Sequence, residues 1–143
     1  MEIKKLNKSY IDKILEIENS QNVSILSRNI IENNIEISTI NYYGILDGDN
    51  LIGYMCFSSI LETCDLESIV VHKDYTRKNI ATLLLKFLIS FCRTNSIYNI
   101  FLEVDESNLP AISLYEKFNF TKIDERKNYY KNGNTAYIYN KKL

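Results

Sequence analysis

The chain has 143 residues, a length expected to form a single domain over residues 1–143 with a hydrophobic core of its own. Hydrophobic residues make up 45% of it and charged residues 24%, and a net charge of −1 excludes a general electrostatic attraction to nucleic acid or to an acidic membrane. No stretch approaches the about 20 apolar residues that a membrane span requires. We therefore expect a cytoplasmic protein that binds its partners at a local site.

The sequence contains three cysteines, Cys56, Cys64 and Cys92. Their number is odd, and their spacing matches neither a metal site nor a CxxC motif. We expect them to be reduced thiols that act as small hydrophobic core residues, and we expect no bound metal.

The N-terminal part of the sequence predicts a strand, two helices and a hairpin. Ser9 is expected to cap the first helix, because its hydroxyl precedes a run of apolar residues with helical spacing. Asp47-Gly48-Asp49-Asn50 predicts a tight turn, since Asp-Gly supplies the positive φ that such turns need. The expected elements are a strand at 2–6, a helix after Ser9, a weaker helix at 25–35, and paired strands at 42–46 and 51–60.

The middle of the chain predicts a buried strand, a short basic loop and a long amphipathic helix. The β-branched run Ile69-Val70-Val71 ends a strand expected at 61–71, and apolar residues repeat from Ile80 with the spacing of one helix face. The helix should end near Asn95-Ser96, because Asn tolerates a left-handed conformation. Arg77-Lys78 places two cations where the first helical N–H groups have no partners, which is a setting that attracts phosphate.

The last third predicts a further strand, a helix and a hairpin. The strand at 97–104 follows the central helix and should therefore lie parallel to the strand at 61–71. Asn108 is expected to cap a helix that has Pro110 in its first turn and Tyr115 on its apolar face. Two strands at 120–130 and 135–142, joined by a turn at 131–134, complete the expected order.

Glu103 interrupts an apolar run in a strand that, being parallel and central, is expected to be covered on both faces. One interpretation is a buried carboxylate whose pKa is raised, as suits a general base. The other is a residue near a strand end that reaches solvent. The residues alone do not decide between the two.

Other polar and aromatic residues have ordinary interpretations when each is taken alone. Tyr115 is expected to be a core aromatic residue whose hydroxyl finds one partner, and His72 a surface residue without a role. A polar and aromatic patch in a late strand is expected to be either a sheet face or the wall of a peptide groove; its members are Arg126, Asn128, Tyr129 and Tyr130.

The order β-α-α-β-β-β-α-β-α-β-β, together with two motifs, resembles the GCN5-related N-acetyltransferase (GNAT) superfamily. LEVDESNLPAISLYEKFNF at 102–120 and RKNYY at 126–130 are similar to the LEVR-x-SN-x-x-AI-x-LY-x-x-x-GF and RxNYY motifs of the bacterial ribosomal-protein-alanine N-acetyltransferases. The resemblance implies an α/β fold with a central, mixed, twisted sheet of about seven strands flanked by about four helices.

The resemblance also implies a site for acetyl-CoA. The main chain of Ile69, Val70 and Val71 would line the pantetheine and acetyl group, and Asn108 would hydrogen-bond CoA. Thr76 and Asn79 depart from the Gln or Arg and the Gly that the family has in this loop, and Asn is the residue that best replaces such a Gly. The residues implied around the pyrophosphate are Arg77, Lys78, Asn79, Ile80, Ala81 and Thr82.

Catalytic and substrate-binding roles follow from the same resemblance. Glu103 would be the general base, directly or through water, and Tyr115 the general acid that protonates the departing thiolate. Segment 19–27 lacks the Pro and Trp that the family usually carries there, which leaves the peptide preference open. The residues implied to bind the acceptor are Arg126, Asn128, Tyr129 and Tyr130.

The leading expectation is thus an acetyl-CoA-dependent N-acetyltransferase that modifies the N-terminal α-amine of a protein, of the ribosomal-protein-alanine type, acting as a monomer or weak dimer. One alternative is an enzyme of the same superfamily that acts on a small amine, a polyamine or an antibiotic. Another is a CoA-binding module without catalysis, which only Thr76 and Asn79 support.

Overall fold

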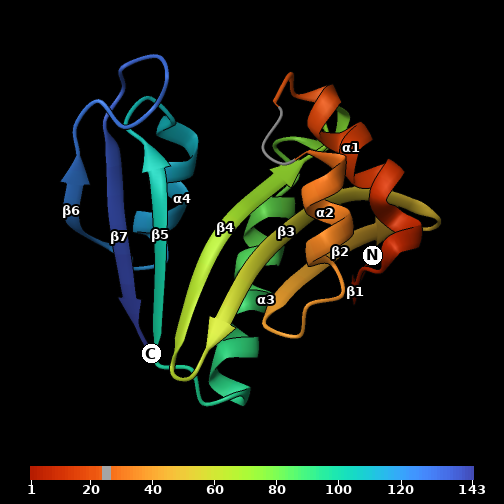
Figure 1. The fold of residues 1–143 in the computed structure, drawn as a ribbon, viewed down its shortest axis with the longest axis horizontal. Helices are drawn as coiled ribbons and strands as arrows, with labels where there is room; N and C mark the ends of the chain where they lie inside the picture. The colour runs from red at the N-terminus through yellow and green to blue at the C-terminus, as the bar shows by residue number, and fades with distance from the viewer. Residues whose placement is uncertain (24–26) are drawn as a thin grey trace.

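The computed structural model describes residues 1–23 and 27–143, which form one mixed sheet of seven strands and four α-helices (Figure 1). The strand order is β1-β2-β3-β4-β5-β7-β6, and β4 and β5 are the one parallel pair over these residues. The α/β fold class expected from the sequence is confirmed. The strands are β1 (Glu2–Lys5), β2 (Ile40–Asp47), β3 (Asn50–Ile60), β4 (Thr63–Val71), β5 (Asn99–Asp105), β6 (Thr121–Arg126) and β7 (Ala136–Lys142); the helices are α1 (Ile11–Ser20), α2 (Arg28–Asn34), α3 (Ile80–Thr94) and α4 (Leu109–Lys117).

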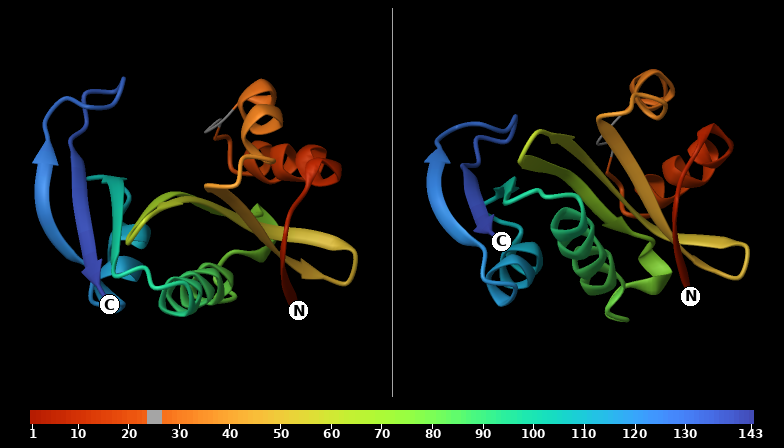
Figure 2. Two further views of the ribbon diagram at one scale, coloured as in Figure 1. Left: turned by 60° about the horizontal axis from the view of Figure 1, so that its bottom comes forward. Right: turned by 90° about the horizontal axis from the view of Figure 1, so that it is seen from below.

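The helices cover the two faces of the sheet in pairs, with α1 and α2 on one face and α3 and α4 on the other (Figure 2). Leu84 and Leu88 of α3 are fully buried in one apolar cluster, and Ile14 and Ile17 of α1 are fully buried in a second. Burying a side chain of this size stabilises the fold by roughly 1.5–3 kcal/mol. The sheet is therefore a middle layer between two apolar cores.

The helix ends differ from the sequence expectations in their caps. Asn7, not Ser9, accepts the capping hydrogen bond, from the Ser9 N–H, and a short 3-10 turn at Lys8–Tyr10 leads into α1. The helix α2 begins at Arg28 after the cap Ser27, while residues 25 and 26 of the expected helix lie outside the described residues.

The helix α3 ends where the sequence predicts, but the left-handed residue is Ser96 (φ 56°) and not Asn95. The Asn95 side-chain amide instead donates to the Phe91 carbonyl, at 2.8 Å. Asn95 thus satisfies one of the last carbonyls of the helix with its side chain.

The last hairpin also differs from the sequence expectation. The strand predicted at 120–130 ends at Arg126, and Asn128 takes a left-handed conformation (φ 53°) that breaks the strand. The N–H groups of Tyr129 and Tyr130 both donate to the carbonyl of Asn134. The aromatic part of the RKNYY motif therefore lies in a folded loop above the sheet.

Two irregularities of β4 shape the middle of the sheet. Cys56 and Phe57 of β3 pair with Ser68 and Leu66 of β4, so Glu67 is an extra residue that forms a β-bulge. The bulge changes which side chains face which helix, because Leu66 packs in the cluster of α3 whereas Val70 packs in that of α1.

The strands β4 and β5 pair only over Thr63–Leu66 and Asn99–Leu102, and beyond these residues they diverge (Figure 1). The sheet therefore opens in its middle, at the carboxyl ends of two parallel strands.

The three cysteines are buried, as expected of core residues. Among the helices in the described parts of the chain, none is long and apolar enough to cross a membrane.

Candidate active site

Two cavities lie along the line where β4 and β5 diverge. The first, of about 670 Å³, lies beside the start of α3 and is called the helix cleft. The second, of about 600 Å³, lies on the sheet and is called the sheet pocket. The helix cleft is lined by Gln21, Val23, Ile69, Val70, Val71, Tyr75, Thr76, Arg77, Asn79, Ile80, Ala81, Thr82, Asn108, Pro110 and Leu114; the sheet pocket is lined by Asp65, Leu66, Glu67, Phe101, Leu102, Glu103, Arg126, Tyr129, Tyr130 and Ile138.

The loop before α3 turns its backbone sharply at the edge of the helix cleft. Arg77 and Asn79 both adopt the left-handed conformation, with φ of 62° and 61°. Asn79 takes this conformation as an N-cap without a side-chain hydrogen bond, so it adopts the backbone conformation that a Gly would adopt there. The N–H groups of Ile80, Ala81 and Thr82 come before the first intrahelical bond, which runs from Leu83 to Asn79. This end of the cleft is suited to an anion.

Lys78 lies apart from the other loop residues that the resemblance implied. Its Nζ lies 5.2 Å from the ring centroid of Tyr75, and Lys78 does not line the helix cleft. Arg77 therefore supplies the cationic side chain that does line it.

The end of α1 forms one wall of the helix cleft through contacts that no sequence pattern indicated. Gln21 Nε2 donates to the Val71 carbonyl at 2.8 Å, and the Lys73 N–H donates to Ser20 Oγ at 3.1 Å. One turn earlier, the Tyr54 hydroxyl donates to the buried carboxylate of Glu18 at 2.6 Å. These bonds fix the end of α1 against β4. The Gln21 bond also occupies one of the main-chain carbonyls expected to face pantetheine.

Two of the expected residues belong to the helix α4 and its cap, and one of them, Asn108, lines the helix cleft. The Asn108 side-chain oxygen accepts from the Ala111 N–H at 3.3 Å and caps the helix, so its amide nitrogen is the group left for a ligand. Tyr115 is 8% exposed, packs against Phe120 with ring centroids 5.7 Å apart, and lines neither cavity. Burial raises the pKa of Tyr115 to about 12, so the phenol stays protonated at neutral pH.

Glu103 lies on the floor of the sheet pocket, and the expectation that both faces of its strand are covered is wrong. Its side chain is 35% exposed and forms an ion pair with Arg126 of β6, at 3.2 Å between Oε1 and Nη1. The face is open because β4 has diverged from β5 at this level and α1 contacts β3 and β4 instead. Of the two interpretations of Glu103, the residue that reaches solvent is the one the structure shows.

Two further carboxylates on β4 line the sheet pocket and were missed in the sequence. Burial and the charge of Glu103 raise the pKa of Asp65. Burial raises the pKa of Glu67 most, and the charges of Asp65 and Glu103 add to it, while a hydrogen bond from Ser58 opposes the rise. Alternation along the strand could have placed Asp65 and Glu67 on one face, but the pattern could not show that Glu103 faces them.

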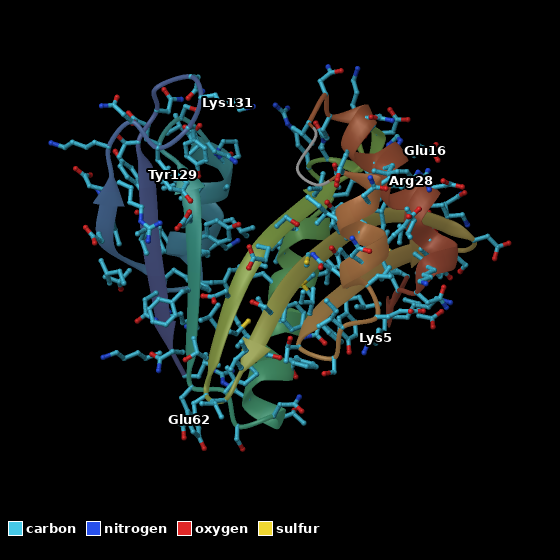
Figure 3. All side chains as sticks on the ribbon, viewed as in Figure 1. Lys5, Glu16, Arg28, Glu62, Tyr129 and Lys131 are labelled. Atoms are coloured by element: carbon cyan, nitrogen blue, oxygen red, sulfur yellow. The ribbon has the colours of Figure 1, made fainter. Side chains whose placement is uncertain are left out.

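The loop that carries Tyr129 and Tyr130 closes the far side of the sheet pocket. The Arg126 guanidinium lies 5.5 Å from the ring centroid of Tyr129, and the rings of Tyr129 and Tyr130 meet edge to face at 5.2 Å. Figure 3 shows Tyr129 on the β5–β7 side of the opening, across from the end of α1. Asn128 lines neither cavity, and its contribution is the left-handed turn that positions the two tyrosines.

Comparison with known proteins agrees with this architecture. The Acetyltransferase (GNAT) family matches residues 11–120, most of the chain, so the chain belongs to this family. The N-alpha-acetyltransferase of Saccharolobus solfataricus is 43% identical over 83 residues, which cover 56% of this chain and 48% of that one. The [Ribosomal protein bS18]-alanine N-acetyltransferase of Salmonella typhimurium is 33% identical over 82 residues, 57% of this chain and 55% of that one. The matched segments thus span about half the length of these relatives.

A solved structure shows the same fold over the whole chain. The ribosomal-protein-S18-alanine N-acetyltransferase from Escherichia coli superposes with a TM-score of 0.93 at 24% sequence identity, covering 99% of this chain and 93% of that one.

Proposed function

We propose that the protein transfers the acetyl group of acetyl-CoA to the N-terminal α-amine of a protein, of the ribosomal-protein bS18 alanine type. The observation that carries the proposal is the pair of neighbouring cavities that lie where β4 and β5 diverge. A helix terminus with free N–H groups borders one of them, and carboxylates line the other. Both relatives are named for acetylation of an α-amine or of an N-terminal alanine.

The residues of the helix cleft fit acetyl-CoA. The left-handed loop residues turn the backbone of residues 77–82 toward the cleft, where free N–H groups and Arg77 would hold the pyrophosphate. The main chain of Ile69–Val71 and the amide nitrogen of Asn108 would hold the pantetheine arm. The cosubstrate supplies an acetyl group activated as a thioester.

The sheet pocket would receive the acceptor amine. Glu103 would take one proton from the amine, directly or through water, as the nitrogen bonds to the acetyl carbon and the carbon–sulfur bond breaks. An α-ammonium has a pKa of about 7.7–8.0, so a carboxylate assists a group that already loses its proton near neutral pH. The acceptor chain would lie in the sheet pocket in contact with Arg126, Tyr129 and Tyr130.

Tyr115 would donate its proton, or a hydrogen bond, to the departing thiolate. Its protonated phenol at neutral pH supports the role of a donor. Leu114, its neighbour in α4, lines the helix cleft, and the tyrosine side chain would have to rotate away from Phe120 to bring its hydroxyl to the same cavity.

The test is turnover of acetyl-CoA with short peptides that differ only in the first residue, beside spermidine, with the product mapped by mass spectrometry. We expect acetylation of the α-amine of the peptide that begins with alanine. Acetylation of spermidine alone would favour the small-amine alternative, and CoA binding without turnover of any amine would favour the non-catalytic module.

A further inference from the structure

Glu67 lies at the point where the two cavities approach each other. It lines the sheet pocket, whereas Ile69 lines the helix cleft, so Ser68 alone separates the two along β4. Glu67 is the extra residue of the bulge in this strand, and a bulge is a common means of redirecting a side chain next to an active site. An acceptor that reaches the thioester must therefore pass beside Glu67.

In the described part of the chain, Glu67 has a hydrogen bond with Ser58 but no cationic side chain as a partner. The sheet pocket contains the carboxylates of Asp65, Glu67 and Glu103 but one guanidinium, that of Arg126, which pairs with Glu103. Among the described residues, no ion pair involves Glu67 or Asp65. Burial raises the pKa of Glu67 most, and the charges of Asp65 and Glu103 add to the rise; a cation bound in the pocket would offset this negative charge.

The proton-accepting role proposed for Glu103 leaves Glu67 without a part in the chemistry. Because Glu103 already serves the reacting amine, the carboxylate of Glu67 is suited to bind a second positive charge, on a part of the acceptor a short distance from that amine. An acceptor with a negative charge next to Glu67 would bind weakly because like charges repel, whereas an acceptor with a positive charge there would be electrostatically complementary. The pocket should therefore discriminate acceptors by charge.

We propose that Glu67 is a specificity-determining residue, which pairs with a positive charge that the acceptor carries in addition to its reacting amine. The acceptor would be a chain whose N-terminal residue is followed by Arg or Lys. This inference rests on the proposed function, because it assigns the sheet pocket to the acceptor.

The test uses three peptides that begin with Ala and differ only in the second residue, which is Arg, Gln or Glu. The parent protein should prefer the Arg peptide over the Glu peptide by about 10-fold or more in kcat/KM. In Glu67→Gln, which keeps the shape of the side chain, the preference should fall to within about threefold, through a higher KM for the Arg peptide. The kcat and the KM for acetyl-CoA should stay unchanged.

Glu62→Gln is the matched control, because it removes one negative charge from the turn between β3 and β4. Figure 3 shows Glu62 at the opposite end of the sheet from Tyr129. This variant should keep the preference of the parent. Raising the ionic strength should weaken the preference of the parent more than that of Glu67→Gln.

The inference is overturned if the parent shows no preference, if Glu67→Gln keeps it, or if Glu67→Gln loses activity equally on all three peptides. If no peptide is acetylated, the proposed function fails, and Glu67 is then tested with spermidine against butylamine. A preference for spermidine that Glu67→Gln loses would support a role in binding a second charge, and equal use of both amines would overturn it.

Discussion

The two cavities of the candidate active site differ in how they are built. The helix cleft is formed largely by consecutive residues, from Ile69 at the end of β4 to Thr82 in the first turn of α3. The sheet pocket combines β4, β5, β6 and β7 with a loop, and an ion pair between two of its lining residues joins positions 103 and 126. The difference suggests that a site within one strand-loop-helix unit follows from local sequence, whereas a site across strands depends on their pairing.

The largest expected effect concerns the sheet pocket. Glu103→Gln keeps size and polarity but removes the proposed base, so turnover should fall by about 10²–10⁴-fold. The loss should shrink as pH rises, because more of the amine is then already deprotonated. Rates measured from pH 6 to pH 10, with CoA affinity as the control, check this; activity equal to that of the parent at neutral pH would show that the carboxylate is structural.

A smaller loss of rate is expected when the proposed proton donor to the thiolate is removed. Tyr115→Phe removes the hydroxyl and keeps the packing against Phe120, so the rate should fall by about 10²-fold while the melting temperature stays close to that of the parent. Because a proton donor is lost and not a base, raising the pH should not restore the rate. A rescue at high pH like that of Glu103→Gln would argue against the assigned role.

The helix cleft is tested through its backbone. Asn79→Val places a β-branched residue at φ 61°, which costs about 1–3 kcal/mol, so CoA affinity should fall about tenfold. Asn79→Gly should bind CoA as well as the parent or better. The control is Asn119→Gly, which also replaces a left-handed residue (φ 65°) but lies outside both cavities, and which should leave CoA affinity unchanged. Calorimetry that shows full affinity in Asn79→Val would remove the glycine-like role.

The smallest effect is electrostatic. Arg77→Glu should weaken CoA binding by about 3–10-fold at low salt and less at high salt, because its charge lies at the anion-binding end of the cleft. Lys86→Glu makes the same charge change on an exposed position of α3 outside the cleft and should have little effect. Equal losses in both variants would indicate a general charge effect and not a site.

The sequence predicted the parts of the fold that depend on neighbouring residues. The periodicity of α3 and the β-branched end of β4 follow from short stretches, whereas the glycine-like conformation at Asn79 was implied by the family resemblance. The bulge at Glu67 could not be predicted in this way, because it depends on which residues of β3 pair with which residues of β4. The exposure of Glu103 was likewise hidden, since it depends on where β5 loses its partner.

The resemblance to a known family named four residues of the sheet pocket, Glu103, Arg126, Tyr129 and Tyr130, but not their geometry. It implied Arg126 as a substrate residue, and the structure shows a guanidinium that also holds Glu103. It implied Asn128 as a contact, and the structure shows a turn residue outside the pocket. Contacts between strands that are distant in sequence have no local pattern that could reveal them.

The central claim, that the two cavities are the two halves of one transfer site, is tested most directly with a bisubstrate compound in which CoA is joined through an acetyl bridge to the α-amine of an alanine peptide. Because the compound fills both cavities at once, we predict that it binds more than about 10²-fold more tightly than CoA. Arg77→Glu and Tyr129→Ala, which alter opposite ends of the site, should each weaken its binding. An affinity equal to that of CoA, insensitive to Tyr129→Ala, would contradict the account.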